Sequence, residues 1–144
     1  MARIVSINIS ERKGVQKHEI PRAELRKDHG IVGDAHAGDW HRQVSLLASE
    51  SIDKMKALGL ELDSGAFAEN IVTQGVVLYE LPVGTRVKLG ETALGEVTQI
   101  GKECHTGCAI AVKAGKCIMP TEGIFIRILE DGSIQPGDVL EVLS

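Results

Sequence analysis

The segment GKECHTGCAI, residues 101–110, brings together side chains that could carry out sulfur or metal chemistry. Cys104 and Cys108 stand on either side of a short turn-forming stretch, with Lys102 and His105 beside them, and Cys117 is the third and last cysteine of the chain. The thiolate is the nucleophilic and metal-binding form of cysteine, and nearby cationic groups lower the pKa of a thiol. The pattern therefore indicates a reactive thiol site, with Cys108, Cys104 and His105 as the candidate catalytic residues.

Two other interpretations of this segment have to be weighed. Cys104, His105, Cys108 and Cys117 could supply four zinc ligands, but the spacing C-x3-C with one later cysteine is unlike the paired knuckles of structural zinc sites. A free cysteine can also be a small buried hydrophobic residue. The buried hydrophobic role is favoured for Cys117. For Cys104, a buried hydrophobic role and a functional role are equally well supported. For Cys108 the polar residues before it favour function, and a disulfide with Cys104 stays open.

A second polar stretch, GIVGDAHAGDWHRQV, covers residues 30–44. Asp34, His36, Asp39 and His41 could serve as metal ligands or acid–base groups, and Arg42 could bind a phosphate. The alternative is a solvated glycine-rich loop whose aspartates form turns. Judged by itself, the stretch favours the loop.

Glu69 and Asn70, in GAFAENI, lie where a loop enters an apolar strand. Asn70 could bond the backbone in ordinary turn chemistry, or both residues could face the same pocket as the other polar groups. The spacing leaves both alternatives open.

The elements that must position these residues are mostly short strands. Alternating apolar and polar residues predict strands, and a Pro–Gly or Asp–Gly pair predicts a turn between them. On these grounds we expect strands within residues 3–9, 44–48 and 68–78, two strands joined at residues 89–92 within 85–100, a hairpin over 123–134 turning at Asp131–Gly132, and a last strand after Pro136–Gly137.

One helix is expected directly after the strand at residues 44–48. Ser49 can cap it, Ile52, Met55 and Leu58 share one face, and Gly59 can end it. Glu50 and Lys54 are spaced as an i,i+4 ion pair.

Composition limits the fold and the partners. The chain has 144 residues, a net charge of −4 and 43% hydrophobic residues, as expected for one globular domain spanning residues 1–144. The negative charge argues against nucleic-acid binding. No apolar run is long enough for a spanning helix or a signal peptide, so we expect no membrane partner. A cytoplasmic location with reduced thiols is therefore expected. Frequent turns and short strands predict a mainly β chain, a closed or nearly closed β-barrel with one clear helix and a few short ones.

Five stretches in order resemble a known family. GDAHAGDWHRQVSLL, GAFAENI, PVGTRVKLGETAL, GKECHTGCAI and GIFIRILEDGSIQPGDVLEVL are typical of MOSC domains, named for the C-terminal domain of molybdenum-cofactor sulfurase. The resemblance runs from about Ile4 to Val142 and is greatest for a small standalone bacterial type with an E-C-H segment.

The resemblance implies a barrel related to that of pyruvate kinase, and a role in binding the molybdenum cofactor (molybdopterin) or in sulfur transfer. In molybdenum-containing reductases of this family the cysteine matching Cys108 ligates molybdenum, within an R-x-P-C-like pattern that here reads H-T-G-C. In larger relatives a pyridoxal-phosphate domain forms a persulfide, and this chain has no pyridoxal-phosphate site of its own. The residues implied to bind the cofactor are Asp34, His36, His41, Arg42, Glu69, Asn70, Lys102 and Arg127.

Three functions follow from the resemblance and the thiols. The first is a cofactor-binding sulfur carrier, with Cys108 as persulfide carrier or molybdenum ligand and with cofactor-biosynthesis proteins or a cysteine desulfurase as partners. The second is a molybdenum-dependent reductase of N-hydroxylated compounds that takes electrons from an external donor. The third is a non-catalytic binding module for cofactor-biosynthesis partners, in which the cysteines have no role.

Overall fold

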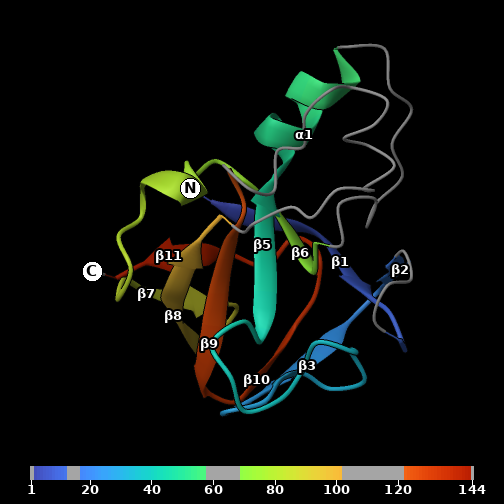
Figure 1. The fold of residues 1–144 in the computed structure, drawn as a ribbon, viewed down its shortest axis with the longest axis vertical. Coiled ribbons are helices and arrows are strands. Elements are labelled where there is room, and N and C mark those ends of the chain that lie inside the picture. The colour runs from blue at the N-terminus through green and yellow to red at the C-terminus, as the bar shows by residue number, and fades with distance from the viewer. Residues whose placement is uncertain (1, 13–16, 58–68, 102–121, 144) are drawn as a thin grey trace.

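The computed structural model describes residues 2–12, 17–57, 69–101 and 122–143 (Figure 1). Within these residues the chain is mostly strand, with one α-helix and one short 3-10 helix. The elements are β1 (Arg3–Ile9), β2 (His18–Ile20), β3 (Ala23–Arg26), β4 (Gly30–Ile31), β5 (Val44–Ala48), α1 (Ser49–Lys56), β6 (Ile71–Gln74), η1 (Leu78–Glu80), β7 (Arg86–Leu89), β8 (Ala93–Ile100), β9 (Ile124–Glu130), β10 (Gly132–Ile134) and β11 (Leu140–Val142).

The main sheet has the strand order β11-β7-β8-β9-β5-β6-β1-β2. Its neighbours are antiparallel except for β5 and β6, which are parallel. All five residues of β5, VSLLA, are buried, as expected for a strand in the middle of a sheet with both faces covered. In Figure 1 β5 runs through the centre of the molecule and leads directly into α1. A smaller sheet, β10-β3-β4, lies at the end away from α1.

Alternation along the strands builds one hydrophobic core. On β9 the side chains of Ile124, Ile126 and Ile128 are fully buried in the core cluster, while Arg127 and Leu129 between and beyond them are only half-buried. Successive side chains of a strand point to opposite faces, so one face of β9 packs inward and the other carries polar groups. The outer face of β9 is therefore free to meet the loop that precedes β5.

β1 meets the segment just before β11, at the opposite side of the main sheet, without closing the sheet into a barrel. An isolated bridge joins Arg3 of β1 to Val139, just before β11. Backbone hydrogen bonds from Ile4 N to Asp138 O (2.8 Å) and from Leu140 N to Ala2 O (2.9 Å) support it. A barrel would need a continuous ladder between the first and last strands. The prediction of a mainly β chain with one clear helix is confirmed, and the expected closed barrel was an overstatement.

The hairpin predicted over residues 123–134 was wrong. The segments on either side of Asp131 do not form a hairpin, because β10 leaves β9 and pairs with β3, with Gly132 opposite Leu25. Gly132 lies so close to the backbone of Ala93 that a Cβ there would stand 2.5 Å from its nitrogen, a contact that only glycine permits. The hairpin between β7 and β8 was predicted correctly.

The start of the helix also differs from the prediction. Ser49 is the first helical residue, and Ala48 occupies the N-cap without a side-chain hydrogen bond. The expected Glu50–Lys54 pair is replaced by longer-range contacts, since Lys54 bonds Glu122 at 3.0 Å and Glu50 accepts from Gly75 N at 3.0 Å. The expected helix end at Gly59 lies outside the described residues. No helix in the described part of the chain is long and apolar enough to cross a membrane.

Candidate functional site

The loop between β4 and β5 begins with a buried carboxylate. Asp34 accepts hydrogen bonds from the backbone N–H of Ser10 at 3.1 Å and of His36 at 3.2 Å. The bond to a backbone N–H two residues ahead is the Asx-turn that aspartate favours in loops. Asp34 therefore shapes the loop and joins it to the end of β1.

Asp34 is also the partner of a buried lysine that the sequence analysis missed. The side chain of Lys17 is only 1% exposed, and its Nζ lies 2.7 Å from Asp34 Oδ1. It also lies 3.0 Å from His36 Nδ1 and 3.4 Å from Ser10 Oγ. Lys17 stands among polar residues between Gly14 and Pro21, a context that gives no sign of burial. A buried charge needs such a partner, because an isolated ion in the interior costs several kcal/mol or more.

Trp40 connects the group formed by Lys17, Asp34 and His36 to the side chains of His41 and Arg42. Its Nε1–H donates to the carbonyl oxygen of His36 at 2.7 Å, and its ring meets that of His41 edge-on, with centroids 5.8 Å apart. The guanidinium of Arg42 lies 6.0 Å from the centre of the Trp40 ring and 5.4 Å from that of Phe125, within cation–π range of both. The loop thus extends as one connected structure from Asp34 to Arg42.

Gln99 near the end of β8 anchors His41 and Arg42. Its Oε1 lies 3.1 Å from Arg42 Nε and 3.0 Å from His41 Nε2, while its Nε2 donates to Gly101 O at 2.8 Å. The partners determine how the amide is turned, because arginine can only donate and a carbonyl can only accept. A register shift between Val97 and Gln99 interrupts the ladder with β9, and such a bulge redirects the side chains next to it.

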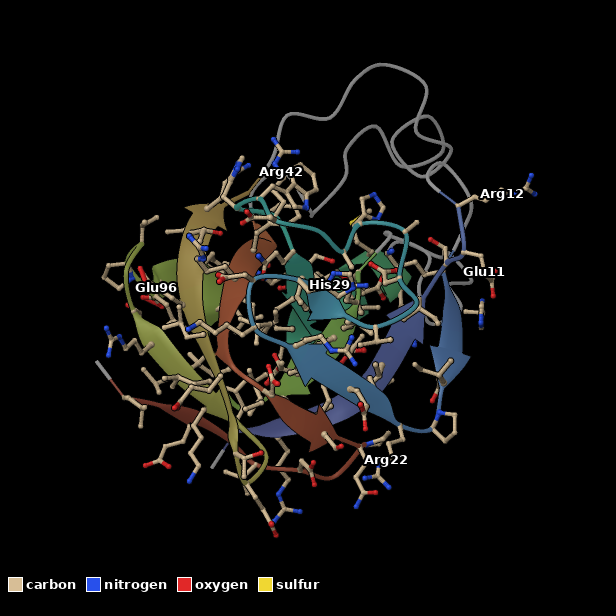
Figure 2. The ribbon with its side chains drawn as sticks, turned by 90° about the horizontal axis from the view of Figure 1, so that it is seen from below. Glu11, Arg12, Arg22, His29, Arg42 and Glu96 are labelled. Carbon is tan, nitrogen blue, oxygen red and sulfur yellow. The ribbon has the colours of Figure 1, made fainter. Side chains whose placement is uncertain are left out.

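Within the described part of the chain, Arg42 is held in place without an acidic partner. Among the described residues its Nε is bonded to Gln99, and no acceptor is found for its two Nη groups. Its side chain is half-buried, next to the point where β8 ends. Figure 2 shows Arg42 at the rim of the molecule. A guanidinium fixed between aromatic rings with its Nη edge unsatisfied is suited to binding an anion such as a phosphate or a carboxylate.

The profile of the MOSC domain matches residues 33–141, about three quarters of the chain. The chain belongs to the MOSC domain family. The matched region starts beside Asp34 and includes both Arg42 and Gln99, whereas Lys17 and Ser10 precede it. No curated protein matches this sequence.

Solved structures with the same fold agree with this assignment. The YuaD protein from Bacillus subtilis has a TM-score of 0.81 and 18% sequence identity, with 99% of this chain and 96% of that chain covered. YiiM from Geobacillus stearothermophilus has a TM-score of 0.71 and 21% identity, covering 100% of this chain and 76% of that one. YiiM from Escherichia coli has a TM-score of 0.65 and 18% identity, covering 99% and 70%. At these identities the likeness shows the MOSC fold alone.

The remaining described candidates of this MOSC domain are bonded to partners other than Gln99 and Arg42. Asn70 bonds the strands themselves, with its Oδ1 accepting from Ser45 N at 2.9 Å and its Nδ2 donating to Asn8 O at 3.1 Å. Glu69 beside it is fully buried. Arg127 pairs with Asp28 at 2.7 Å, a hydrogen bond that raises the pKa of the guanidinium. Asn70 therefore has the backbone-bonding role that was one of its two alternatives.

The sulfur-bearing part of the MOSC domain lies outside the described residues. This applies to Lys102, Cys104, His105, Cys108 and Cys117. Described residues on its two sides are joined, since Gly101 N donates to Gly123 O at 2.6 Å. That hydrogen bond lies beside Gln99, which itself bonds Gly101. The described residues on the two sides of the segment therefore lie next to the group that holds Arg42. Within the described residues no three His, Cys, Asp or Glu side chains form a metal-binding group.

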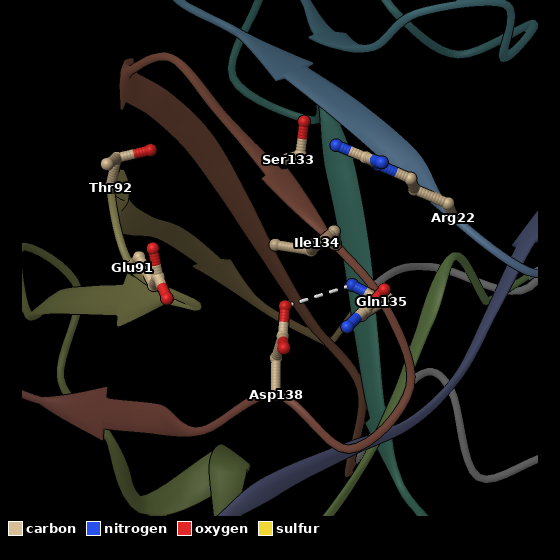
Figure 3. A pocket seen from close by; sticks show the side chains of 7 residues that line it. All are labelled: Arg22, Glu91, Thr92, Ser133, Ile134, Gln135 and Asp138. Atoms are coloured by element: carbon tan, nitrogen blue, oxygen red, sulfur yellow. Dashed lines mark hydrogen bonds between the residues drawn. The ribbon is translucent and has the colours of Figure 1, made fainter.

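Two hollows on the MOSC domain have none of the predicted site residues among the described residues that line them. One, of about 430 Å³, lies between α1 and the residues after β6, with Lys54, Tyr79 and Glu122 in its lining. The other, of about 410 Å³, is polar, and Figure 3 shows Arg22 and Ser133 facing Glu91 and Asp138 across it. Arg22 and Arg42 lie at opposite ends of the molecule in Figure 2, so this second hollow is separate from the Arg42 group.

Proposed function

We propose that this MOSC domain binds the molybdenum cofactor and that Cys108 serves as persulfide carrier or molybdenum ligand. The observation that carries the proposal is the Arg42 guanidinium, held by Gln99 and two aromatic rings with its Nη groups unsatisfied by the described residues, next to the end of β8. The cysteine segment begins directly after that strand. The cationic donor thus lies beside the point at which the sequence enters the cysteine segment.

The described residues fit a cofactor that ends in a phosphate. Arg42 would supply two parallel N–H donors, the arrangement that binds a phosphate with two hydrogen bonds. His41, whose Nε2 lies against Gln99 Oε1, would help to hold the group in place. Lys102 follows two positions after the end of β8 in the sequence. The hydrogen bond between Asp34 and His36 holds the start of the loop in place. Arg127 contributes least, because its charge is already paired with Asp28.

The cofactor, when bound, would supply the redox chemistry of molybdenum, and the protein would supply position and environment. A cysteine thiolate is a soft ligand suited to such a metal. As a sulfur carrier, the Cys108 thiolate would attack the outer sulfur of a donor's cysteine persulfide. One S–S bond forms at Cys108 while the donor's S–S bond breaks and its cysteine leaves as a thiolate, so no outside oxidant is needed. The donor would be a cysteine desulfurase, met in a reducing cytoplasm.

The test is elemental analysis for molybdenum and zinc on protein produced in a cofactor-competent host. We compare the wild type with Cys108→Ser and Arg42→Gln, and with Arg86→Gln as a control on an exposed side chain of β7. We expect near-stoichiometric molybdenum in the wild type and in Arg86→Gln, and a clear loss in Arg42→Gln. Loss in Cys108→Ser would identify a molybdenum ligand.

A second measurement covers the sulfur-carrier role. After incubation with a cysteine desulfurase and cysteine, the intact mass of the wild type should rise by one sulfur atom, and Cys108→Ser should be unchanged. Absence of both molybdenum and persulfide from the wild type would contradict the proposal. Zinc in place of molybdenum would mean that the cysteines form a structural metal site.

A further inference from the structure

The buried ammonium of Lys17 uses all three of its N–H bonds inside the protein. They point to Asp34 Oδ1 at 2.7 Å, His36 Nδ1 at 3.0 Å and Ser10 Oγ at 3.4 Å. The Asp34 carboxylate beside it also accepts two backbone N–H groups, from Ser10 and His36. The lysine and the aspartate therefore form a charged pair with almost no contact with solvent.

This arrangement decides where the proton of His36 is. A lysine ammonium has only donors, so the ring nitrogen that faces it must be an acceptor. His36 Nδ1 therefore carries a lone pair, and the proton of the neutral ring is on Nε2. The rest of the residue is also held, because its N–H donates to Asp34 Oδ2 and its carbonyl accepts from Trp40 Nε1. His36 remains one-third exposed, so part of its ring lies at the surface of the loop.

We propose that Lys17 is a positioning residue that holds His36 as the neutral Nε2–H tautomer. Whichever group meets Nε2, the ring then offers it a hydrogen-bond donor and cannot accept from it. This step rests on the function proposed above, in which the loop that carries His36 also carries the anion-binding Arg42. A protonated donor facing the same side of the ring would be rejected, because donor would meet donor.

His41 provides an internal comparison in the same loop. Its Nε2 lies against Gln99 Oε1, an acceptor, so its ring is set by an amide on β8 without any contact with Lys17. Removing the ammonium should change the protonation pattern of His36 and leave that of His41 unchanged. General unfolding would alter both.

The experiment is a long-range ¹H–¹⁵N correlation spectrum of protein with ¹⁵N-labelled histidine rings at neutral pH. We expect His36 Nδ1 to resonate as an unprotonated acceptor nitrogen and Nε2 as a protonated one. In Lys17→Met the two shifts should move toward each other, as the ring exchanges between tautomers or becomes an imidazolium. Lys56→Met, which removes an exposed lysine from α1, should leave the spectrum unchanged. A His36→Gln sample assigns the signals.

Lys17→Met leaves Asp34 buried without its ion-pair partner and can prevent folding. The double variant Lys17→Met/Asp34→Asn removes both charges and still lacks the ammonium, so the same change at His36 is expected there. A wild-type spectrum with the proton on Nδ1, or an unchanged His36 in both variants, would overturn the inference. The spectrum does not depend on cofactor content. If the wild type has the expected tautomer but never contains molybdenum or persulfide, the proposed function fails while the role of Lys17 stands.

Discussion

At the scale of single residues, Asn70 shows how one side chain can join strands that are distant in sequence. Its Oδ1 accepts from both the backbone N–H and the hydroxyl of Ser45, and its Nδ2 donates to the carbonyl of Asn8. Asn70 is 1% exposed, so no water can replace these bonds if the amide is removed. The ends of β1 and β5 that carry the Asp34 loop depend on this side chain.

Asn70→Ala should therefore lower the free energy of unfolding by about 1–3 kcal/mol, the usual cost of leaving buried polar groups unsatisfied. Urea denaturation at neutral pH measures the loss. Gln74→Ala, at the exposed end of β6, the strand that begins directly after Asn70, is the matched control and should change stability by less than about 0.5 kcal/mol. Equal losses in the two variants would show that the Asn70 bonds contribute nothing of their own.

At the scale of elements, α1 is attached to the sheet through polar contacts at its two ends. Glu50 in its first turn accepts from Gly75 N, just after β6, at 3.0 Å, and this hydrogen bond lowers the pKa of the carboxyl. Ser51 and Lys54 both bond Glu122, which precedes β9. A carboxyl whose pKa is lowered by folding stabilises the native state above its unfolded value, and that contribution is lost as the pH falls through the folded value.

Glu50→Gln should thus be less stable than the wild type at neutral pH, and the two should become equal in acid, below the ordinary pKa of 4.5. The glutamine can still accept from Gly75 N, so the difference reports the charge alone. Solvent screens this exposed group, so we expect less than about 1 kcal/mol at neutral pH. Urea denaturation across this pH range is the measurement. A difference that grows toward low pH would have the wrong sign.

At the scale of the whole molecule, the main sheet is held together where β1 meets the segment that leads into β11. The amides of Ile4, Gly137 and Leu140 all donate across this junction, at 2.7–2.9 Å. The neighbouring side chains of Ile4 and Leu140 are in the core. Opening the junction would therefore expose apolar surface from both ends of the chain, so it should not open on its own.

Hydrogen exchange followed by NMR tests this coupling. We expect the amides of Ile4, Gly137 and Leu140 to exchange as slowly as those of β5 in the middle of the sheet, with opening free energies close to that of global unfolding. The amides of β2, which pairs only with β1 at the sheet edge, should exchange faster. Fast exchange at the junction with slow exchange in β5 would show that the two ends separate locally.

Much of this protein could be predicted from local sequence. Alternation marked β1, β8 and β9, helical spacing marked α1, and the ordered polar stretches indicated the MOSC family that the profile match then established. These features are local because the side-chain period of a strand or helix depends only on neighbouring residues. The polar loop from Asp34 to Arg42 was found in the same way, through residue types that cannot form a core.

Tertiary structure alone decided which distant groups meet. The alternation of β10 predicts a strand equally well whether it pairs with β9 or with β3, and the close approach of Gly132 to Ala93 selects its place. Lys17 resembled a solvated lysine until folding enclosed it beside Asp34, and the environment of Arg42 depends on Gln99, 57 positions away. A strand, a charge or a donor is a property of the local sequence. Which strand, charge or acceptor it pairs with is selected by tertiary packing. The selected packing buries the most apolar surface and leaves the fewest polar groups unsatisfied.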